Sequence, residues 1–304
     1  MKRVVVIAGP TSSGKTNYSI KYAENCDAKM INSDSIQMYR DLKILTDFPT
    51  AYKSCGIEHK LFGFLGSDEK ITVFDWATLA ANEVETTFQK NKTPIIVGGT
   101  GFFINTLING ISPIPEISQK VRQNASMLAK NNYDELCEHI YSHDPRLEAA
   151  IPRSKHRQML RAYEVMLTTG KSILHFHETA RTKFIQEVFY DFSIMVPNRE
   201  KLYSRVSDRV DSMMKNGAID EVQASLSALG IDRSCLFQEL TAQYPIFRAI
   251  GAKEIIEYLN GKCAYDTMVE LIKKNTRHYA KRQITWFQNQ VRETEKIKIQ
   301  WIND

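Results

Sequence analysis

The chain has 304 residues, enough for one large domain or for a domain with a smaller insertion, and its formal net charge of +5 is too modest to identify a polyanionic partner by itself. Five cysteines lie far apart without a Cys-x-x-Cys pair, which argues against a zinc site and a disulfide framework and favours a reducing cytosol. The first apolar run ends after five residues at Gly9, too short for a secretory core or a membrane span.

The first predicted element is a buried strand over residues 4–8, which leads into the loop 9–16, Gly-Pro-Thr-Ser-Ser-Gly-Lys-Thr. This loop fits the phosphate-loop pattern Gly-x-x-x-x-Gly-Lys-Thr without substitution. Its glycines let backbone N–H groups turn toward an anion, Lys15 adds a charge, and the Thr16 hydroxyl can reach a Mg²⁺ ion. A helix predicted over 16–23 adds its N-terminus. The alternative, a bland glycine turn, is disfavoured by the strand in front.

Two further strands are predicted, over residues 28–31 and 93–97, with a helix over 73–90 between them. The first strand is followed by Asn-Ser-Asp-Ser and the second by Gly-Gly-Thr-Gly. Strands that alternate with helices predict a parallel sheet, in which the carboxyl ends of the strands face one ligand crevice. We therefore expect Asp34, Ser35, Thr100 and the phosphate loop to share that crevice.

The rest of the chain predicts an insertion and a return to the core. A proline-containing break near residue 112 starts a helical, polar and basic segment, and the predicted division is a core part over 1–112, a helical insertion over 113–184 and a second core part over 185–304. A strand over 188–196 begins that second part, followed by helical segments over about 199–228, 246–260 and 265–290. The predicted fold class is α/β, a parallel-sheet P-loop NTPase-like core with an inserted helical subdomain.

Phosphate loops occur most often in nucleotide hydrolases and small-molecule kinases. Such enzymes hold Mg²⁺ through a second aspartate after a neighbouring strand, whereas strand 93–97 ends in Gly-Gly-Thr, although Asp34 could substitute. Asp34 itself is either a helix N-cap or a general base in the crevice, with Ser35 and Gln37 as hydrogen-bonding neighbours. Thr100 either belongs to a plain strand-to-helix turn or donates to an oxygen that develops negative charge.

Several separated segments together resemble one family, the tRNA dimethylallyltransferases, which transfer an isopentenyl group to the exocyclic amine of the adenosine just 3′ of the anticodon. The resemblance extends from residue 1 to about 290. The matching segments are 9–16, 32–40, 95–101, 161–165 with 169–171, 205–217, 248–251 and 279–287.

The resemblance implies that the loop holds the diphosphate of dimethylallyl diphosphate, which is the leaving group. Asp34 would take the amine proton, Thr100 would hydrogen-bond the bridging oxygen of the departing pyrophosphate, and Arg209 would balance its growing charge together with Mg²⁺ at Thr16. The product would be N6-isopentenyladenosine (i6A) in tRNAs that read U-initial codons. The implied diphosphate-binding residues are Gly9, Thr11, Ser12, Ser13, Gly14, Lys15 and Thr16.

Two basic segments with aromatic neighbours bear on the partner, one at residues 153–161 and the other at 277–286. Composition alone favours solvated helix faces, but the resemblance reverses this preference and implies contact with a tRNA anticodon stem-loop whose target adenosine is extruded into the crevice. The implied tRNA-binding residues are Asp34, Ser35, Ile36, Gln37, Thr100, Arg122, Arg157, Gln158, Arg161, Arg248, Arg277, Lys281 and Arg282.

Three segments depart from the family's pattern. Residues 44–49 read Ile-Leu-Thr-Asp-Phe-Pro where the family usually has Ile-Gly-Thr-Ala-Lys-Pro, so the lysine is missing. Residues 152–158 replace the usual His-Pro-Asn-Asp run, and Arg157 and Gln158 therefore rank below Arg161 as tRNA contacts. Residues 252–254, Ala-Lys-Glu, replace Tyr-Lys-Glu.

Other functions stay open at this point. They are an isopentenyltransferase acting on free adenine nucleotide, a small-molecule kinase or nucleic-acid-binding NTPase, and a non-catalytic RNA-binding protein, against which the intact Lys15, Asp34 and Arg209 argue. We expect a bacterial cytoplasmic enzyme that is monomeric and has no membrane association.

Overall fold

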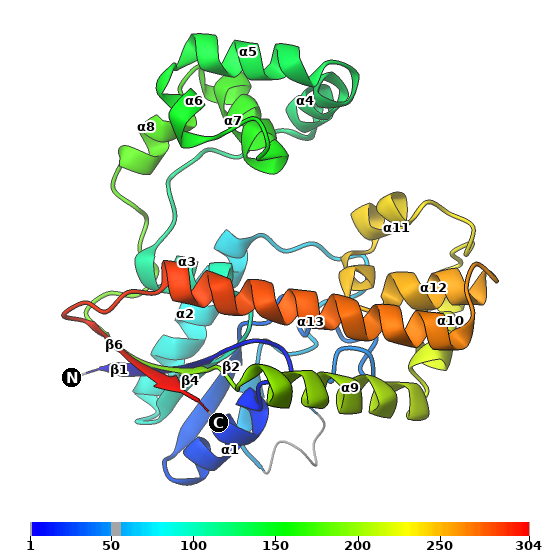
Figure 1. The fold of residues 1–304 in the computed structure, drawn as a ribbon. Helices are drawn as coiled ribbons and strands as arrows, with labels where there is room; N and C mark the ends of the chain where they lie inside the picture. Colours follow the sequence, from blue (N-terminus) through cyan, green and yellow to red (C-terminus); the bar gives the residue numbers. More distant parts are fainter. Residues whose placement is uncertain (1, 50–55, 304) are drawn as a thin grey trace. The chain divides into compact units, whose positions relative to one another are not determined.

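The computed structural model describes residues 2–49 and 56–303 and divides into two compact units (Figure 1). The first unit comprises Met1–Ile108 and Phe184–Asp304, and the second comprises Asn109–Lys183. Cys55 lies outside the described residues, and the other four cysteines are free thiols. The second unit begins four residues before the helical insertion predicted over 113–184 and ends one residue before the end of that segment.

The first unit is built on an all-parallel sheet, which confirms the predicted α/β class. Six strands of the described residues pair in the order β3-β2-β4-β1-β5-β6. The predicted strands are all present, whereas the two edge strands, β3 and β6, are absent from the prediction. The strands are β1 (Arg3–Ala8), β2 (Ala28–Asn32), β3 (Glu58–Lys60), β4 (Thr93–Gly98), β5 (Phe189–Met195) and β6 (Ile297–Ile302).

Helices cover both faces of this sheet, which explains why its central strands are continuous apolar runs. α1 (Lys15–Glu24) packs on one face through Ile20, against Ile7, Met30 and Val97. The other face packs on the remaining helices of the unit and forms the larger core. These helices are α2 (Val73–Gln89), α3 (Gly101–Asn109), α9 (Arg199–Lys215), α10 (Ala218–Ala228), α11 (Phe237–Gln243), α12 (Ala252–Leu259), α13 (Tyr265–Gln290) and the 3₁₀ helix η1 (Pro245–Arg248).

The register of the sheet aligns the carboxyl ends of its four central strands. Ala8 of β1 lies beside Gly98 of β4 and Ile194 of β5, and Asn32 of β2 lies beside Val97. The segments that follow β1, β2 and β4 therefore leave the sheet at the same edge. This edge carries the phosphate loop and the two polar turns that the sequence pattern indicates.

Two of the predicted helical segments are interrupted. The prediction of one helix over 199–228 is wrong, because α9 ends at Lys215 and Gly217 has a φ of +90°, a conformation that residues with a side chain rarely adopt. Segment 246–260 likewise divides into η1 and α12, and α11 is missing from the prediction. The predicted helix over 265–290 is confirmed as α13.

α13 is the longest helix and packs beside α9 and α12 (Figure 1). Its buried side follows a helical spacing that includes Met268, Ile272, Ala280 and Phe287. Within the two described ranges, neither α13 nor any other helix combines the length and the apolar character that crossing a membrane requires.

The second unit is helical and has a core of its own. Leu136 and Ile140 of α5 pack with Met159 and Val165 of α7 and with Phe176 of α8. Side-chain caps start several of these helices, including Ser118, whose hydroxyl accepts a hydrogen bond from the Val121 N–H. The helices are α4 (Gln119–Asn131), α5 (Tyr133–His143), α6 (Arg146–Ala150), α7 (His156–Thr169) and α8 (Ile173–Glu178).

A hydrogen bond from Trp76 joins α2 to the end of β2, and substitution of Trp76 tests its contribution to stability. The ring is fully buried, and its Nε1–H donates to the Asn32 carbonyl oxygen at 3.0 Å. Trp76→Phe removes this donor and leaves a buried carbonyl without it, so we expect the free energy of unfolding to fall by about 1–3 kcal/mol. Urea denaturation measures the loss. Trp301→Phe is the matched control, since that ring is 40% exposed and should cost less than about 0.5 kcal/mol; equal losses would contradict this role of Trp76.

Candidate active site

A cavity of about 700 Å³ lies at the carboxyl edge of the sheet. Its wall includes the phosphate loop, Asp34 and Gln37 after β2, residues 43–49, and the side chains of Arg205 and Arg209 from α9. The cavity therefore gathers polar groups from segments that are far apart in the sequence.

The phosphate loop turns tightly between β1 and α1. Ser12 and Gly14 have φ values of 60° and 90°, and the Lys15 ammonium group donates to the Pro10 carbonyl oxygen at 2.6 Å. The hydroxyl oxygens of Ser12 and Ser13 are buried and, among the residues that the structure describes, have no hydrogen-bond partner. Because a buried hydroxyl without a partner costs free energy, these two groups fit a loop that binds a polar ligand.

Two arginines from α9 hold the same loop. Arg205 donates to the Ser13 carbonyl oxygen at 3.2 Å, and Arg209 donates to the Thr11 hydroxyl oxygen at 2.9 Å. Together with Lys15 they place three cations around one loop, an arrangement that suits a polyanion. Burial lowers the pKa of Lys15 to about 8, while the Asp34 carboxylate acts to raise it.

Asp34 lies in a turn that its own side chain stabilises. Its Oδ1 accepts a hydrogen bond from the Ile36 N–H at 3.0 Å, and its N–H donates to Oδ1 of Asn32 at 2.8 Å. No helix starts at residues 33–40 of the described chain, so the helix N-cap interpretation of Asp34 is wrong. The Asp34 charge acts to raise the pKa of Lys15 and, after the larger effect of burial, that of Tyr279, so its carboxylate acts on groups of both the loop and α13.

Thr100 lies between the last residue of β4 and the first residue of α3. Its hydroxyl oxygen accepts a hydrogen bond from the Ser35 N–H at 3.1 Å, and the hydroxyl donates to the Ser35 hydroxyl oxygen at 3.4 Å. The segment is therefore a strand-to-helix turn whose hydroxyl is joined to the segment that carries Asp34, and the role of Thr100 as a donor to a developing negative charge stays a prediction.

The segment 43–49 forms another wall of the cavity. Gln37 donates to the carbonyl oxygens of Thr46 and Asp47 at 3.0 and 3.1 Å, and the Glu221 carboxylate accepts hydrogen bonds from two backbone N–H groups at residues 44 and 45. The Asp47 carboxylate lies 3.8 Å from the Arg209 guanidinium. Where the family usually has a lysine, this segment thus contributes a carboxylate and the Phe48 ring to the cavity.

The residues predicted to bind tRNA fall in both units. Ser35, Ile36 and Gln37 follow Asp34 in the first unit. Arg248 ends η1, and its charge acts on Tyr39. On α13 the predicted contacts are Arg277, whose guanidinium lies 5.7 Å from the centre of the Tyr203 ring, the exposed Lys281, and Arg282, which lies 5.6 Å from the centre of the Tyr279 ring.

The remaining predicted tRNA contacts belong to the second unit. Arg122 is exposed on α4, and Arg157 and Gln158 are exposed on the first turn of α7. Arg161, one turn later, is partly buried and pairs with Glu164 at 3.2 Å.

Comparisons with known proteins decide the family. A family model described as IPP transferase matches residues 37–290, and one described as isopentenyl transferase matches residues 2–59. The chain is 36% identical to the tRNA dimethylallyltransferase of Ehrlichia ruminantium over 291 residues, which cover 95% of this chain and 93% of the relative. This chain belongs to the IPP transferase family.

Solved structures agree with this assignment. A full-length tRNA isopentenylpyrophosphate transferase from Bacillus halodurans is 29% identical, with a TM-score of 0.66 over 99% of this chain and 90% of that chain. A eukaryotic dimethylallyltransferase acting on tRNA is 27% identical, with a TM-score of 0.80 over 100% of this chain and 75% of that chain. The fold of this IPP transferase is thus shared with enzymes from distant sources.

Sequence reasoning assigned no role to two side chains that touch the phosphate loop. Arg205 donates to the backbone of Ser13, and Gln283 of α13 accepts a hydrogen bond from the Thr11 N–H at 2.9 Å. Both residues lie in segments that resemble the family, but no local spacing relates them to a loop about 190 and 270 residues earlier. The Thr11 N–H and hydroxyl are therefore already engaged by two helices of this IPP transferase.

The donor groups at the loop suit a Mg²⁺ ion. The exposed Thr16 residue and the Asp34 and Asp47 carboxylates line the same cavity, and oxygen atoms of this kind are the ligands that Mg²⁺ prefers. In the described residues no group of three or more His, Cys, Asp or Glu side chains could hold a metal by itself. The residues fit an ion whose other ligands come from phosphate oxygens and water.

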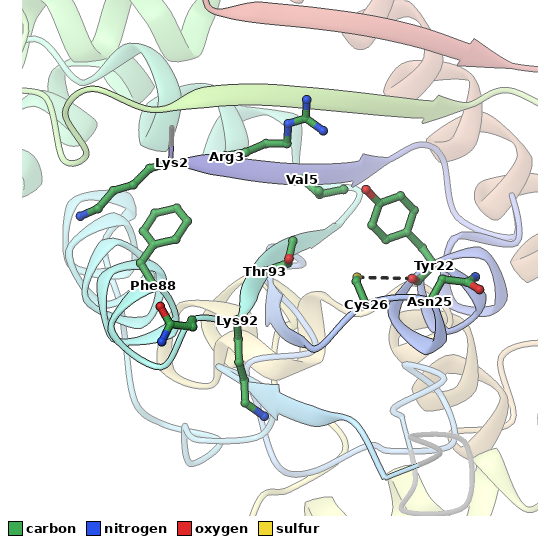
Figure 2. Close-up of a pocket in the computed structure, with 10 residues that line it drawn as sticks. Lys2, Arg3, Val5, Tyr22, Asn25, Cys26, Phe88, Lys92 and Thr93 are labelled. Atoms are coloured by element: carbon green, nitrogen blue, oxygen red, sulfur yellow. Dashed lines mark hydrogen bonds between the residues drawn. The ribbon is translucent and has the colours of Figure 1, made fainter.

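A second hollow of about 720 Å³ lies at the opposite, amino end of the strands (Figure 2). Its three cations each form an ion pair: Lys2 with Glu85, Arg3 with Asp191, and Lys92 with Asp27. The Cys26 thiol donates to the Tyr22 carbonyl oxygen, drawn as a dashed line in Figure 2. Because its charges are balanced and the phosphate loop leaves the sheet at the other edge, this hollow is a weaker candidate for the active site of an IPP transferase.

The lowered pKa of Lys15 predicts how pyrophosphate binding depends on pH. Since the pKa is about 8 instead of 10.5, the ligand-free loop loses this charge as the pH rises through 8. Binding to the uncharged form then requires proton uptake, and we expect the Kd for Mg²⁺-pyrophosphate to rise above pH 8 by up to about tenfold per pH unit.

Titration calorimetry measures both the Kd and the proton uptake. Lys15→Arg is the matched control, because its guanidinium stays charged and should flatten the pH profile. Parallel profiles in the two proteins would contradict the assignment of the pH dependence to Lys15.

Proposed function

We propose that this IPP transferase transfers a dimethylallyl group from dimethylallyl diphosphate to the N6 amine of the adenosine 3′ of the anticodon, giving i6A in tRNAs that read U-initial codons. The observation that carries the proposal is the meeting, in one cavity, of the cationic phosphate loop with Asp34, next to the Thr100 turn. Relatives named tRNA dimethylallyltransferase, 36% and 34% identical over nearly the whole chain, support the reaction class.

The diphosphate of the donor binds to the phosphate loop in this proposal. Backbone N–H groups of the loop and the N-terminus of α1 face its oxygens, and the Ser12 and Ser13 hydroxyls gain the partners that burial demands. Lys15 and Arg209 supply positive charge. The Thr16 hydroxyl would hold Mg²⁺, which would supply further charge neutralisation when bound.

The reaction is a substitution at the allylic carbon. The adenine N6 lone pair forms a bond to C1 of the dimethylallyl group while the bond from C1 to the diphosphate oxygen breaks, and pyrophosphate leaves with the electron pair. The Asp34 carboxylate takes the proton that N6 loses. Asp34 can keep this position because its Oδ1 is fixed by the Ile36 N–H.

Charge that develops on the leaving group is stabilised by preorganised donors. Thr100 accepts from the Ser35 N–H at 3.1 Å and donates to the Ser35 hydroxyl oxygen at a long 3.4 Å, and in this proposal its hydroxyl turns from that weak contact to the bridging oxygen of the bound diphosphate. Arg209 touches the loop through Thr11 and balances the charge on the outer oxygens. Each such donor is typically worth about 3 kcal/mol in the transition state.

In this proposal the tRNA contacts come from exposed basic side chains. On the first unit, Lys281 and Arg282 of α13 offer phosphate contacts, with Tyr279 beside them as a surface for stacking. On the second unit, Arg157 and Gln158 are exposed and Arg122 is exposed on α4. We further propose that the enzyme works in the cytoplasm as a monomer.

A prenyltransferase acting on free adenine nucleotide and a P-loop kinase are the competing functions. The exposed basic residues of α7 and α13 favour tRNA over a free nucleotide. A glycine and threonine turn after β4, in place of the aspartate that ATP-dependent enzymes use there, disfavours the kinase.

Asp34→Asn tests the assigned base. Asparagine keeps an oxygen that accepts from the Ile36 N–H but cannot take a proton, so we expect the turnover number to fall by about 10²- to 10⁴-fold with little change in thermal stability. The assay follows radiolabelled dimethylallyl groups into unmodified tRNA. Asp41→Asn is a matched control, because that aspartate accepts from Ser67 and is not part of the cavity wall; near-normal turnover of Asp34→Asn would remove the base from the mechanism.

The acceptor is tested by competition. With labelled dimethylallyl diphosphate and Mg²⁺, we expect label in tRNA that carries an adenosine-rich anticodon loop, and none in AMP supplied at the same concentration, because the single phosphate of AMP cannot make the several backbone contacts that the basic residues of α13 and the second unit offer to tRNA. Label in AMP alone would support the free-nucleotide enzyme. Phosphate release from ATP without prenyl transfer would support the kinase class.

A further inference from the structure

Gln283 is a buried polar residue that the mechanism above does not use. It lies on the side of α13 that carries Tyr279 and Trp286, at the i, i+4 and i+7 positions of one helix face. The residue is 6% exposed, so its amide must find hydrogen-bond partners inside the protein.

The Gln283 amide bridges two segments of the candidate active site. Its Oε1 accepts a hydrogen bond from the Thr11 N–H of the phosphate loop at 2.9 Å, and its Nε2 donates to the Gly99 carbonyl oxygen at 2.9 Å. The phosphate loop offers the Thr11 N–H as a donor, and the turn after β4 offers the Gly99 carbonyl oxygen as an acceptor. An amide satisfies both at once, whereas a carboxylate or an apolar side chain cannot.

The turn after β4 is shaped to receive this face of α13. A Cβ atom at Gly99 would lie 2.3 Å from Nε2 of Gln283, and one at Gly101 would lie 2.1 Å from the Trp286 ring. Both glycines are needed because the helix rests directly on the backbone of the turn. Thr100 lies between them, so its backbone is held from both sides.

Through its two partners, Gln283 is also linked to Asp34 and Arg209, the two other groups assigned to the reaction. Thr100 accepts from the Ser35 N–H, next to Asp34, and Thr11 accepts from Arg209 through its hydroxyl oxygen. Gln283 therefore connects the segment that binds the leaving group with the hydroxyl that donates to it. A change in this connection alters their separation without removing either group.

We propose that Gln283 is a positioning residue of the transfer step, which fixes the phosphate loop relative to the Thr100 turn through its two hydrogen bonds. This inference rests on the proposed function and concerns the same site. It assigns to α13 a task inside the cavity besides the tRNA contacts of its exposed face.

Gln283→Met tests the proposal, because methionine has a similar length and forms neither hydrogen bond. We expect the turnover number with saturating tRNA and dimethylallyl diphosphate to fall by about tenfold to a hundredfold, as misplacement of reacting groups does, with little change in KM for tRNA. The Thr11 amide should also exchange its hydrogen faster. Gln283→Glu keeps an acceptor for Thr11 but loses the donor to Gly99, and it carries the same test if the methionine variant does not fold.

A double-mutant cycle with Thr100→Ala separates positioning from general damage. If Gln283 acts through Thr100, the double variant Gln283→Met with Thr100→Ala should be no slower than Thr100→Ala alone. Thr276→Val is the matched control: Thr276 lies two turns before Gln283 on α13, and the substitution removes its buried hydrogen bond to the Ile272 carbonyl oxygen, so this variant should keep its turnover number.

The outcomes distinguish the two proposals. Prenyl transfer by the unaltered enzyme with losses that multiply in the double variant, or with a turnover number that Gln283→Met leaves unchanged, would overturn the role of Gln283 and leave the proposed function intact. No prenyl transfer by the unaltered enzyme would overturn the proposed function and this inference together.

Discussion

The parallel pairing of β1 with both β4 and β5 is the constraint on which the rest of the molecule depends. It places Ala8 beside Gly98 and Ile194, and through β4 it brings the end of β2 to the same edge. The polar segments that follow these strands therefore start close together. Hydrogen bonds such as that from the Ser35 N–H to the Thr100 hydroxyl oxygen complete an arrangement that strand register has already prepared.

Electrostatics opposes the approach of the α9 arginines to this edge unless negative charge is present there. Lys15, Arg205 and Arg209 repel one another around the loop, and the nearby Asp34 and Asp47 carboxylates offset that repulsion in part. An anionic ligand offsets it further, since its charge sits where the cations converge. The departure at residues 44–49 fits this balance, because an acidic residue pairs with Arg209 there and no lysine is added.

How much could be predicted from the sequence depended on distance along the chain. The phosphate loop, its strand and the predicted meeting with Asp34 and Thr100 follow from local patterns. The three-residue β3, Glu-His-Lys, has no apolar alternation and carried no such signal, whereas β6, Ile-Lys-Ile-Gln-Trp-Ile, alternates and could have been recognised. Gly217 likewise marks a helix end, but its apolar neighbours favoured the prediction of one continuous helix. The contacts of Gln283 could not be predicted, because its partners lie 272 and 184 residues away in the sequence.

That same separation has a consequence for how the protein is made. Residues 9–16 leave the ribosome early, but Arg209 follows 198 residues after Thr11, and Gln283 follows 272 residues after it. Even β5, the neighbour of β1, is synthesised after the entire second unit. The phosphate loop is thus among the first segments to be synthesised and among the last to reach its final shape, and a nascent chain that lacks α13 holds the loop without its full set of anchors.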